Sequence, residues 1–292
     1  MAYESNSPEK HALSKYENQR IFETYIIPNY FDKLTSATNP SVHFFGAQPG
    51  AGKSAIQAST KQALVELDGA SSVASIIGDE FRSYHPDYST LMQEDDNLAA
   101  FYTDHDSGRW VERSITYTLQ AKPHVILEGT LRNPQTTLDT ANLYKDAGFE
   151  QYLHIVAVHE FISRLRIFER YIGQIEKAGF GRYTMPEAHG RAYTALPQSL
   201  KTLTESRMFH GITIYNASGN VIAQANGVTE AIPVLDTALM SERSGDNLDY
   251  ASLIDTAEQL IIRVKQASRL AVLGDLTKLI GEIRQAAERH GH

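Results

Sequence analysis

The chain contains no cysteine, and this absence excludes disulfide bridges and metal centres held by thiolate ligands. No apolar run approaches the length that a membrane-spanning helix needs. Residues 1–20 are polar throughout and lack the apolar segment of a signal peptide. We therefore expect a protein of the reducing cytoplasm that does not enter a membrane.

Basic residues are in the minority, with 27 Lys and Arg against 35 Asp and Glu and a formal net charge of −8. General nucleic-acid binders usually carry a basic stripe, so this balance argues against a nucleic-acid partner while leaving room for a local basic pocket. The 11 histidines include no H-x-x-x-H or H-E-x-x-H spacing, so the sequence predicts no zinc site.

Apolar runs alternate with helical patterns, which predicts an α/β fold. We expect strands at 42–45, 73–77, 125–128, 152–158 and 212–215. Helical spacing covers 8–36, with a break or kink at Pro28, and also 89–121, 134–147 and 160–178. Such alternation predicts a mostly parallel sheet with helices on both faces.

The C-terminal fifth of the chain has a different pattern. Residues 241–247 are polar and typical of a linker. Apolar residues then recur at helical spacing from Leu253 to Leu270, and the pattern restarts after Gly274. We predict one domain at 1–240, which includes the N-terminal helices, and a C-terminal helical hairpin at 241–292. The hairpin either packs on the sheet domain, which we favour, or offers a surface to a partner or a second copy.

One stretch carries a phosphate-binding signature. AQPGAGKS at 47–54 follows the first strand and precedes a helical pattern, which is the P-loop arrangement. Its glycines leave room for backbone N–H groups to surround a phosphate, and the positive end of the following helix adds to the attraction. The residues expected to bind ATP in this way are Gln48, Pro49, Gly50, Ala51, Gly52, Lys53 and Ser54. Lys53 would reach the β- and γ-phosphates, and Ser54 would ligate Mg²⁺.

Two acidic residues follow the next strands. Asp79 comes directly after the second strand and Glu128 ends the third, so both should meet the P-loop at the carboxyl edge of the sheet. Asp79 could accept the proton of an attacking hydroxyl or cap a helix, and spacing alone does not decide between these roles. Glu128 could hold Mg²⁺ through water or bind a substrate hydroxyl.

Arginines cluster around a predicted lid. Arg164, Arg166 and Arg170 share one helical segment, and Arg182 lies in the Gly-rich loop that follows. Phosphoryl transfer spreads negative charge over the moving oxygens, which arginine stabilises. We expect Arg170 and Arg182 to serve this purpose, whereas a single arginine of the helix is more often on a solvated face.

In this order, the motifs resemble those of the zeta toxin family of bacterial toxin–antitoxin systems. The matching segments are AQPGAGKS at 47–54, DEF at 79–81, HP at 85–86, ILEGTLR at 126–132, ERY at 169–171 and GRYTMPEAH at 181–189. The resemblance implies a fold like that of small P-loop kinases. It also implies transfer of the γ-phosphate of ATP to UDP-N-acetylglucosamine, a product that blocks cell-wall synthesis, and an epsilon-type antitoxin partner.

The resemblance also implies a role for individual residues. Lys53 matches the phosphate-binding lysine, and Ser54 matches the Mg²⁺ ligand. Asp79 matches the general base that activates the sugar hydroxyl, while Arg170 and Arg182 match the arginines that hold the triphosphate and the developing charge. The residues that match the contacts with the UDP-sugar are Glu112, Glu128, Thr130, Arg132 and Thr140.

The chain departs from the family pattern at three places. Ala47 replaces the first P-loop glycine, which is tolerable if its φ angle is negative. Gly78 precedes the predicted base where a polar residue is usual, and Leu131 replaces a small residue. The last two border the expected sugar pocket, so a kinase of another small hydroxyl substrate is an alternative. A nucleotide-dependent switch acting through a partner is a second one.

Overall fold

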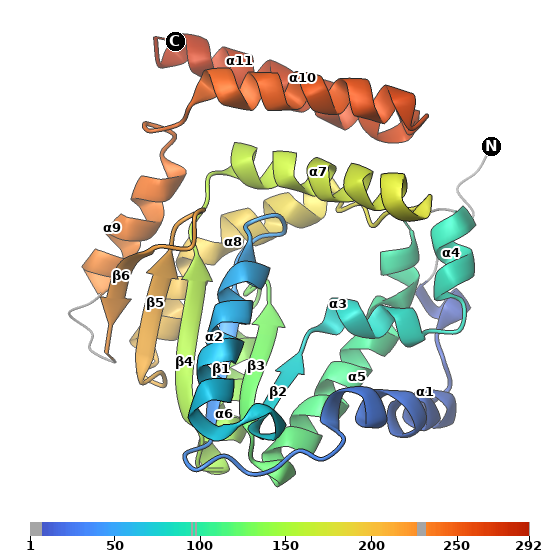
Figure 1. Ribbon diagram of the computed structural model, residues 1–292. Coiled ribbons are helices and arrows are strands. Elements are labelled where there is room, and N and C mark those ends of the chain that lie inside the picture. The colour runs from blue at the N-terminus through green and yellow to red at the C-terminus, as the bar shows by residue number, and fades with distance from the viewer. Residues whose placement is uncertain (1–7, 95, 97, 227–231, 292) are drawn as a thin grey trace.

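A six-stranded sheet lies at the centre of the computed structural model, which describes residues 8–94, 96, 98–226 and 232–291 (Figure 1). Its strands are β1 (Ser41–Gly46), β2 (Val73–Ile76), β3 (His124–Gly129), β4 (Glu150–Val156), β5 (Gly211–Tyr215) and β6 (Val221–Ala225). They are ordered β2-β3-β1-β4-β5-β6. The first five are parallel, as predicted, and β6 pairs antiparallel with β5 at the edge.

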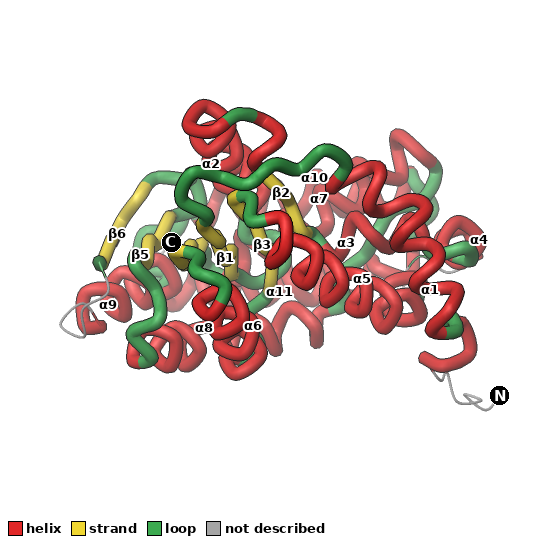
Figure 2. Tube along the Cα trace, turned by 90° about the horizontal axis from the view of Figure 1, so that it is seen from below, coloured by secondary structure: helices red, strands yellow, loops and turns green. Residues whose placement is uncertain are grey.

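Helices cover both faces of this sheet, which confirms the predicted α/β architecture. The helices up to residue 243 are α1 (Lys15–Ile21), a π-helix (Phe22–Phe31), α2 (Lys53–Asp68), α3 (Gly78–Phe81), α4 (Tyr88–Glu94), α5 (Ala99–Ala121), α6 (Pro134–Asp146), α7 (Glu160–Ala178), α8 (Pro186–Glu205) and α9 (Ile232–Arg243). Short 3₁₀ turns lie at Pro8–His11, Ala70–Ser72 and Arg82–Tyr84. Figure 2 shows α2 on one side of the strands and α6, α8 and α9 on the other.

The alternation of side chains along each strand divides the core into two layers. Val42 and Phe44 of β1 join the larger cluster, which α1, α5, α6, α8 and α9 complete. Phe45 points to the other face, where it packs in a smaller cluster with Ile56 and Leu64 of α2. Trp110 is buried in the larger cluster and donates its ring N–H to the carbonyl of Asn18, at 2.9 Å.

Several predicted boundaries were wrong. The helix expected at 8–36 is split into a 3₁₀ turn, α1 and the π-helix, and Pro28 lies inside the π-helix without ending it. The helix expected at 89–121 is two helices, α4 and α5. The strand predicted at 152–158 starts two residues earlier and ends at Val156, and β6 was not predicted. Helix α9 extends through the first three residues of the predicted linker.

The C-terminal hairpin consists of α10 (Tyr250–Gln266) and α11 (Leu273–Arg289), joined through a 3₁₀ turn at Leu270–Val272. It lies along α7 (Figure 1) and buries its apolar stripe against that helix, in a cluster separate from the two layers of the sheet. This is the packing on the sheet domain that we favoured. Leu270, predicted within the stripe, is 63% exposed in the turn. The domain division at residue 240 stays a prediction.

A row of polar side chains crosses the buried α2 side of the sheet. Ser41 Oγ lies 3.0 Å from His43 Nε2 and 2.7 Å from His124 Nδ1. His43 Nδ1 lies 3.0 Å from His154 Nε2, and His154 Nδ1 lies 3.0 Å from the Tyr215 hydroxyl. Each ring nitrogen therefore has a partner inside the protein, as buried polar groups require. Among the residues described, no helix is long and apolar enough to cross a bilayer.

Candidate active site

The loop that the sequence predicts to be a P-loop connects β1 to α2 at the carboxyl edge of the sheet. Gly50 and Gly52 have φ angles of +79° and +97°, which only glycine adopts easily. A Cβ on Gly50 would lie 2.0 Å from the Ser163 carbonyl oxygen, so the loop also depends on glycine to approach α7. Gln48 is buried and donates its side-chain N–H to the Val158 carbonyl at 2.9 Å, which ties the loop to the chain after β4. Ala47 is not among the described residues with a positive φ, so its replacement of glycine is accommodated.

Lys53, the first residue of α2, points to the end of β3. Its Nζ lies 3.6 Å from Glu128 Oε1 and donates to the Ala47 carbonyl at 3.2 Å. Glu128 also accepts a hydrogen bond from Gln57 Nε2 at 2.9 Å. Burial lowers the pKa of Lys53, while the charge of Glu128 opposes that change. The pair therefore places one cation and one carboxylate beside the P-loop.

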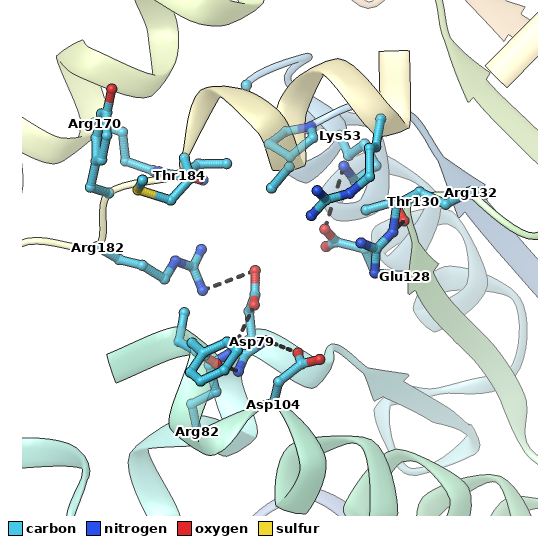
Figure 3. A pocket seen from close by; sticks show the side chains of 18 of the residues that line it. Lys53, Asp79, Arg82, Asp104, Glu128, Thr130, Arg132, Arg170, Arg182 and Thr184 are labelled. Carbon is cyan, nitrogen blue, oxygen red and sulfur yellow. Dashed lines mark hydrogen bonds and ion pairs between the residues drawn. The ribbon is translucent and has the colours of Figure 1, made fainter. Parts of the chain in front are cut away.

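Asp79 lies between two arginines, Arg82 and Arg182 (Figure 3). Its Oδ1 accepts from Arg82 Nε at 3.1 Å, and its Oδ2 lies 2.9 Å from Arg182 Nη1. The protein around the cavity would by itself raise the pKa of Asp79, whose side chain is 43% exposed, but the two arginines outweigh this effect and hold that pKa below its usual value. The N-cap of α3 is Ile77, so Asp79 does not cap the helix. Of the two roles left open, the cap is excluded.

Helix α7 presents arginines to the same space. Arg166 and Arg170 are one helical turn apart and therefore lie on one face. Arg166 donates to the carbonyls of Ala51 and Ala217, and Arg170 donates to Thr184 Oγ1 at 2.9 Å. Burial lowers the pKa of Arg170, and the neighbouring charge of Arg182 lowers it further. The buried Nε of Arg170 has no hydrogen-bond partner within the described part of the chain.

These groups line one cavity of about 1050 Å³. Its walls include the P-loop residues Pro49, Gly50, Gly52, Lys53 and Ser54, the carboxylates Asp79 and Glu128, and the arginines Arg82, Arg132, Arg166, Arg170, Arg182 and Arg191. A polyanion suits this concentration of cations at a helix N-terminus, and the unpaired Arg170 Nε offers it a free donor. The volume is at the upper end of the range for small-molecule sites.

A divalent cation would find few protein ligands here. The Ser54 hydroxyl and the Glu128 carboxylate both line the cavity. No group of three or more His, Cys, Asp or Glu side chains that could hold a metal occurs in the described ranges. This donor set fits Mg²⁺, which keeps several water ligands and is bound mainly through substrate phosphates.

Some of the residues predicted to contact the substrate line the cavity, and others do not. Glu128, Thr130 and Arg132 line the cavity, and Arg132 Nε donates to Thr130 Oγ1 at 3.1 Å. Glu112 is exposed on α5, and the hydroxyl of Thr140 donates to the Thr136 carbonyl within α6. Neither of these two is among the described residues that line the cavity.

Sequence reasoning missed Arg82. This residue is 9% exposed, and besides Asp79 it binds the Ala100 carbonyl at 2.7 Å and Asp104 Oδ1 at 2.6 Å. It therefore fixes the loop after β2 to α5. The available signal was its position three residues after Asp79, which puts both side chains on one face of a helical turn.

Leu131 occupies the space above the end of β1. It is 6% exposed and has a φ of +52°, which is uncommon for a side chain of this size. A Cβ on Gly46 would lie 2.0 Å from Leu131 Cδ1. The absence of a side chain at Gly46, directly before Ala47, thus leaves room for leucine where a small residue is usual.

Comparisons with known proteins show the family of this chain. The sequence model of the zeta toxin family matches residues 29–228. The chain is 31% identical over 211 residues to Toxin PezT of Streptococcus pneumoniae serotype 4 (strain ATCC BAA-334 / TIGR4), covering 72% of this chain and 81% of that protein. It is 28% identical to Toxin zeta of Enterococcus hirae, with 62% of each protein covered.

Solved structures show the same fold. A chain from the PezAT chromosomal toxin–antitoxin system of Streptococcus pneumoniae superposes with a TM-score of 0.70 at 23% identity, covering 88% of this chain and 98% of that one. The AvrRxo1-ORF1:-ORF2 complex contains a chain with a TM-score of 0.56 at 14% identity, covering 91% of this chain and 88% of that one. The family match spans the P-loop, Asp79, Glu128 and both predicted catalytic arginines. The chain belongs to the zeta toxin family.

Proposed function

We propose that the protein is a toxin kinase that transfers the γ-phosphate of ATP to a hydroxyl of UDP-N-acetylglucosamine or a related UDP-amino sugar. The observation that carries this proposal is the convergence of Lys53, Asp79, Arg170 and Arg182 on one cavity. A phosphate-binding loop, a carboxylate and two arginines are the groups that phosphoryl transfer to a hydroxyl requires.

The donor ATP would bind at the P-loop. The loop N–H groups and the N-terminus of α2 would hold its phosphates, together with Lys53. Ser54 would be the protein ligand of Mg²⁺, with Glu128 nearby. When bound, Mg²⁺ supplies positive charge to the phosphate oxygens.

Asp79 would accept the proton of the attacking hydroxyl. The hydroxyl oxygen forms a bond to the γ-phosphorus, the bond from that phosphorus to the β–γ bridging oxygen breaks, and ADP leaves. Each Asp79 oxygen makes one contact with an arginine, so each retains a lone pair for this proton. A carboxylate with a low pKa is a weak base, but this reaction needs positioning of the hydroxyl more than strong proton abstraction.

Arg170 and Arg182 would neutralise the charge on the transferred group. Burial of Arg170 strengthens its attraction for an anion, because water screens it less. Arg182 would exchange part of its contact with Asp79 for the phosphoryl oxygens.

Thr130, Arg132 and Glu128 are proposed to contact the acceptor, with Glu112 and Thr140 as further contacts implied by the family. Because these last two lie outside the cavity lining, a kinase of another small hydroxyl substrate is a second candidate. A panel of UDP-sugars and unrelated hydroxyl compounds separates the two, with ADP release as the signal. Release confined to UDP-amino sugars supports the first candidate, and release with another acceptor alone favours the second.

We also propose that the protein has an epsilon-type antitoxin partner. The solved relatives come from a toxin–antitoxin system and from a two-protein complex. Co-expression of an epsilon-type antitoxin with this chain tests the proposal, because a partner would copurify and suppress ADP release.

A further inference from the structure

Residues 179–185, which we call the arginine loop, connect α7 to α8 and carry Arg182 into the cavity. Helix α7 holds this loop from one side. Gln174 Oε1 accepts the backbone N–H of Arg182 at 2.8 Å, and Arg170 binds Thr184 as described above. A loop of this kind needs several such contacts, because ordering its backbone costs conformational entropy.

The C-terminal hairpin holds the same loop from outside the sheet domain. Arg269, in the turn between α10 and α11, donates from Nη2 to the Gly179 carbonyl at 2.7 Å. Asp275, in the first turn of α11, accepts the hydroxyl of Tyr183 at 2.9 Å. Tyr183 is 4% exposed and packs within the cluster that joins the hairpin to α7. The hairpin therefore contacts the loop on both sides of Arg182.

Helix α7 lies between the hairpin and the cavity, and its two faces differ accordingly. Leu165, Phe168 and Ile172 are buried in the hairpin cluster. Two ion pairs, Arg164 with Glu282 and Arg263 with Glu176, join the same elements. The opposite face carries Arg166, Arg170 and Gln174, spaced at intervals of one turn. The hairpin thus supports both the helix and the loop that supply cationic groups to the cavity.

We propose that the hairpin is a brace for the arginine loop, with Asp275 and Arg269 as positioning residues that act through Arg182. The hairpin lies beyond residue 228, where the family match ends. The inference rests on the proposed function, because that function gives Arg182 its role. A charged group that is already held in place need not move when the phosphate is transferred, and this speeds the reaction. Removing contacts that hold the arginine loop should therefore lower the rate.

The test uses two variants with matched controls in the full-length chain. Asp275→Ala and Arg269→Gln each remove one contact with the loop. Asp255→Ala removes an exposed carboxylate of α10, and Arg284→Gln breaks a pair with Glu258 inside the hairpin. We expect kcat for phosphoryl transfer to fall about tenfold in the first two, as small misplacements of catalytic groups do, with KM for ATP changed less than about twofold. The controls should keep the wild-type kcat.

A double-mutant cycle distinguishes positioning from loss of stability. In an Arg182→Ala background, Asp275→Ala should change kcat by less than about twofold, because the group that it positions is absent. An effect of the same size with and without Arg182 would overturn the proposal, as would equal effects of test and control variants.

Hydrogen exchange supplies a readout that does not require activity. Amides of residues 179–185 should exchange faster in Asp275→Ala and Arg269→Gln than in the wild type and the controls. Unchanged exchange would contradict the brace even in an active enzyme. A wild-type chain that transfers no phosphate would instead contradict the proposed function, and exchange would still decide whether the hairpin holds the loop.

Discussion

Arg182 Nη1 lies 2.9 Å from Asp79 Oδ2, so the proposed base is ion-paired with a group proposed to neutralise the phosphoryl charge. The Arg82 guanidinium contacts the other oxygen of the same carboxylate. These contacts keep Asp79 ionised and aimed into the cavity before any substrate binds. They also make the pKa of Asp79 depend on Arg82 and Arg182.

The first prediction concerns the pH dependence of kcat/KM. Because both arginines lower the pKa of Asp79 below its usual 3.8, the carboxylate stays charged and activity is retained until the pH falls through that low pKa. Arg82→Gln removes one of the two cations, so the acid limb of the profile should move to higher pH. Arg109→Gln, on the neighbouring helix, is the control and should leave the limb in place. An unmoved limb in Arg82→Gln would show that Asp79 is not the titrating base.

The second prediction separates binding from chemistry. Asp79→Asn keeps the size of the side chain, but it leaves one acceptor oxygen in place of two and cannot accept the proton. We expect transfer to fall by about 10²–10⁴-fold, the usual contribution of a general base. The ATP dissociation constant, measured by calorimetry, should change less than about threefold, because the P-loop and Lys53 remain. Full activity of this variant would refute the assignment of Asp79.

The fold was largely predictable, because the five parallel strands are short apolar runs and the segments between them have helical periodicity. Strand β6 escaped prediction because its burial is uneven: Val221 and Gln224 are exposed, while Ala223 and Ala225 are buried. Pro28 was expected to break or kink a helix, and it lies inside the π-helix without ending it. Tertiary packing of Phe22, Ile26 and Phe31 in the core overrides the local preference there.

The site was predictable where residues lie at or just after the ends of strands, as the glycine-rich loop, Asp79 and Glu128 do. Contacts between distant segments were not. The pairing of Arg82 with Asp104 and of Tyr183 with Asp275 depends on how helices pack, which a single sequence does not specify. The contacts implied for Glu112 and Thr140 remain predictions, since neither residue lines the cavity in this conformation.

The third prediction tests the packing of Leu131 over the end of β1. Gly46→Ala would place a methyl group about where Leu131 Cδ1 lies, and Ile155 closes the other side at 3.4 Å. Overpacking of this kind costs about 1–3 kcal/mol in the free energy of unfolding. In a Leu131→Ala background, Gly46→Ala should lower the free energy of unfolding by less than it does in the wild type, because the added methyl group then has room. Urea denaturation measures both effects, and strictly additive losses would contradict the contact.

The fourth prediction concerns stability in acid. Burial lowers the pKa of His43 to about 3 and that of His154 to about 4, so both stay neutral in the folded chain while the unfolded chain protonates them near 6.5. The unfolded state therefore binds more protons between these values, and the free energy of unfolding falls as the pH drops from about 6.5 to about 4. Each histidine contributes about 1.4 kcal/mol per pH unit at most.

Urea denaturation at pH 6.5, 5.5 and 4.5 measures this slope. His154→Leu should make it shallower, because one of the buried rings that take up a proton on unfolding is then absent. His105→Gln, an exposed position on α5, should leave the slope unchanged. Equal slopes in the wild type and His154→Leu would contradict the account of the histidine row.

The central claim is phosphoryl transfer to a UDP-amino sugar. The most direct measurement incubates the purified chain with ATP, Mg²⁺ and UDP-N-acetylglucosamine, and follows the sugar nucleotide by mass spectrometry, with Asp79→Asn as the control. We predict a product that carries one added phosphate, formed with one equivalent of ADP and absent from the control. An unmodified sugar nucleotide in the presence of a chain that binds ATP would contradict the claim.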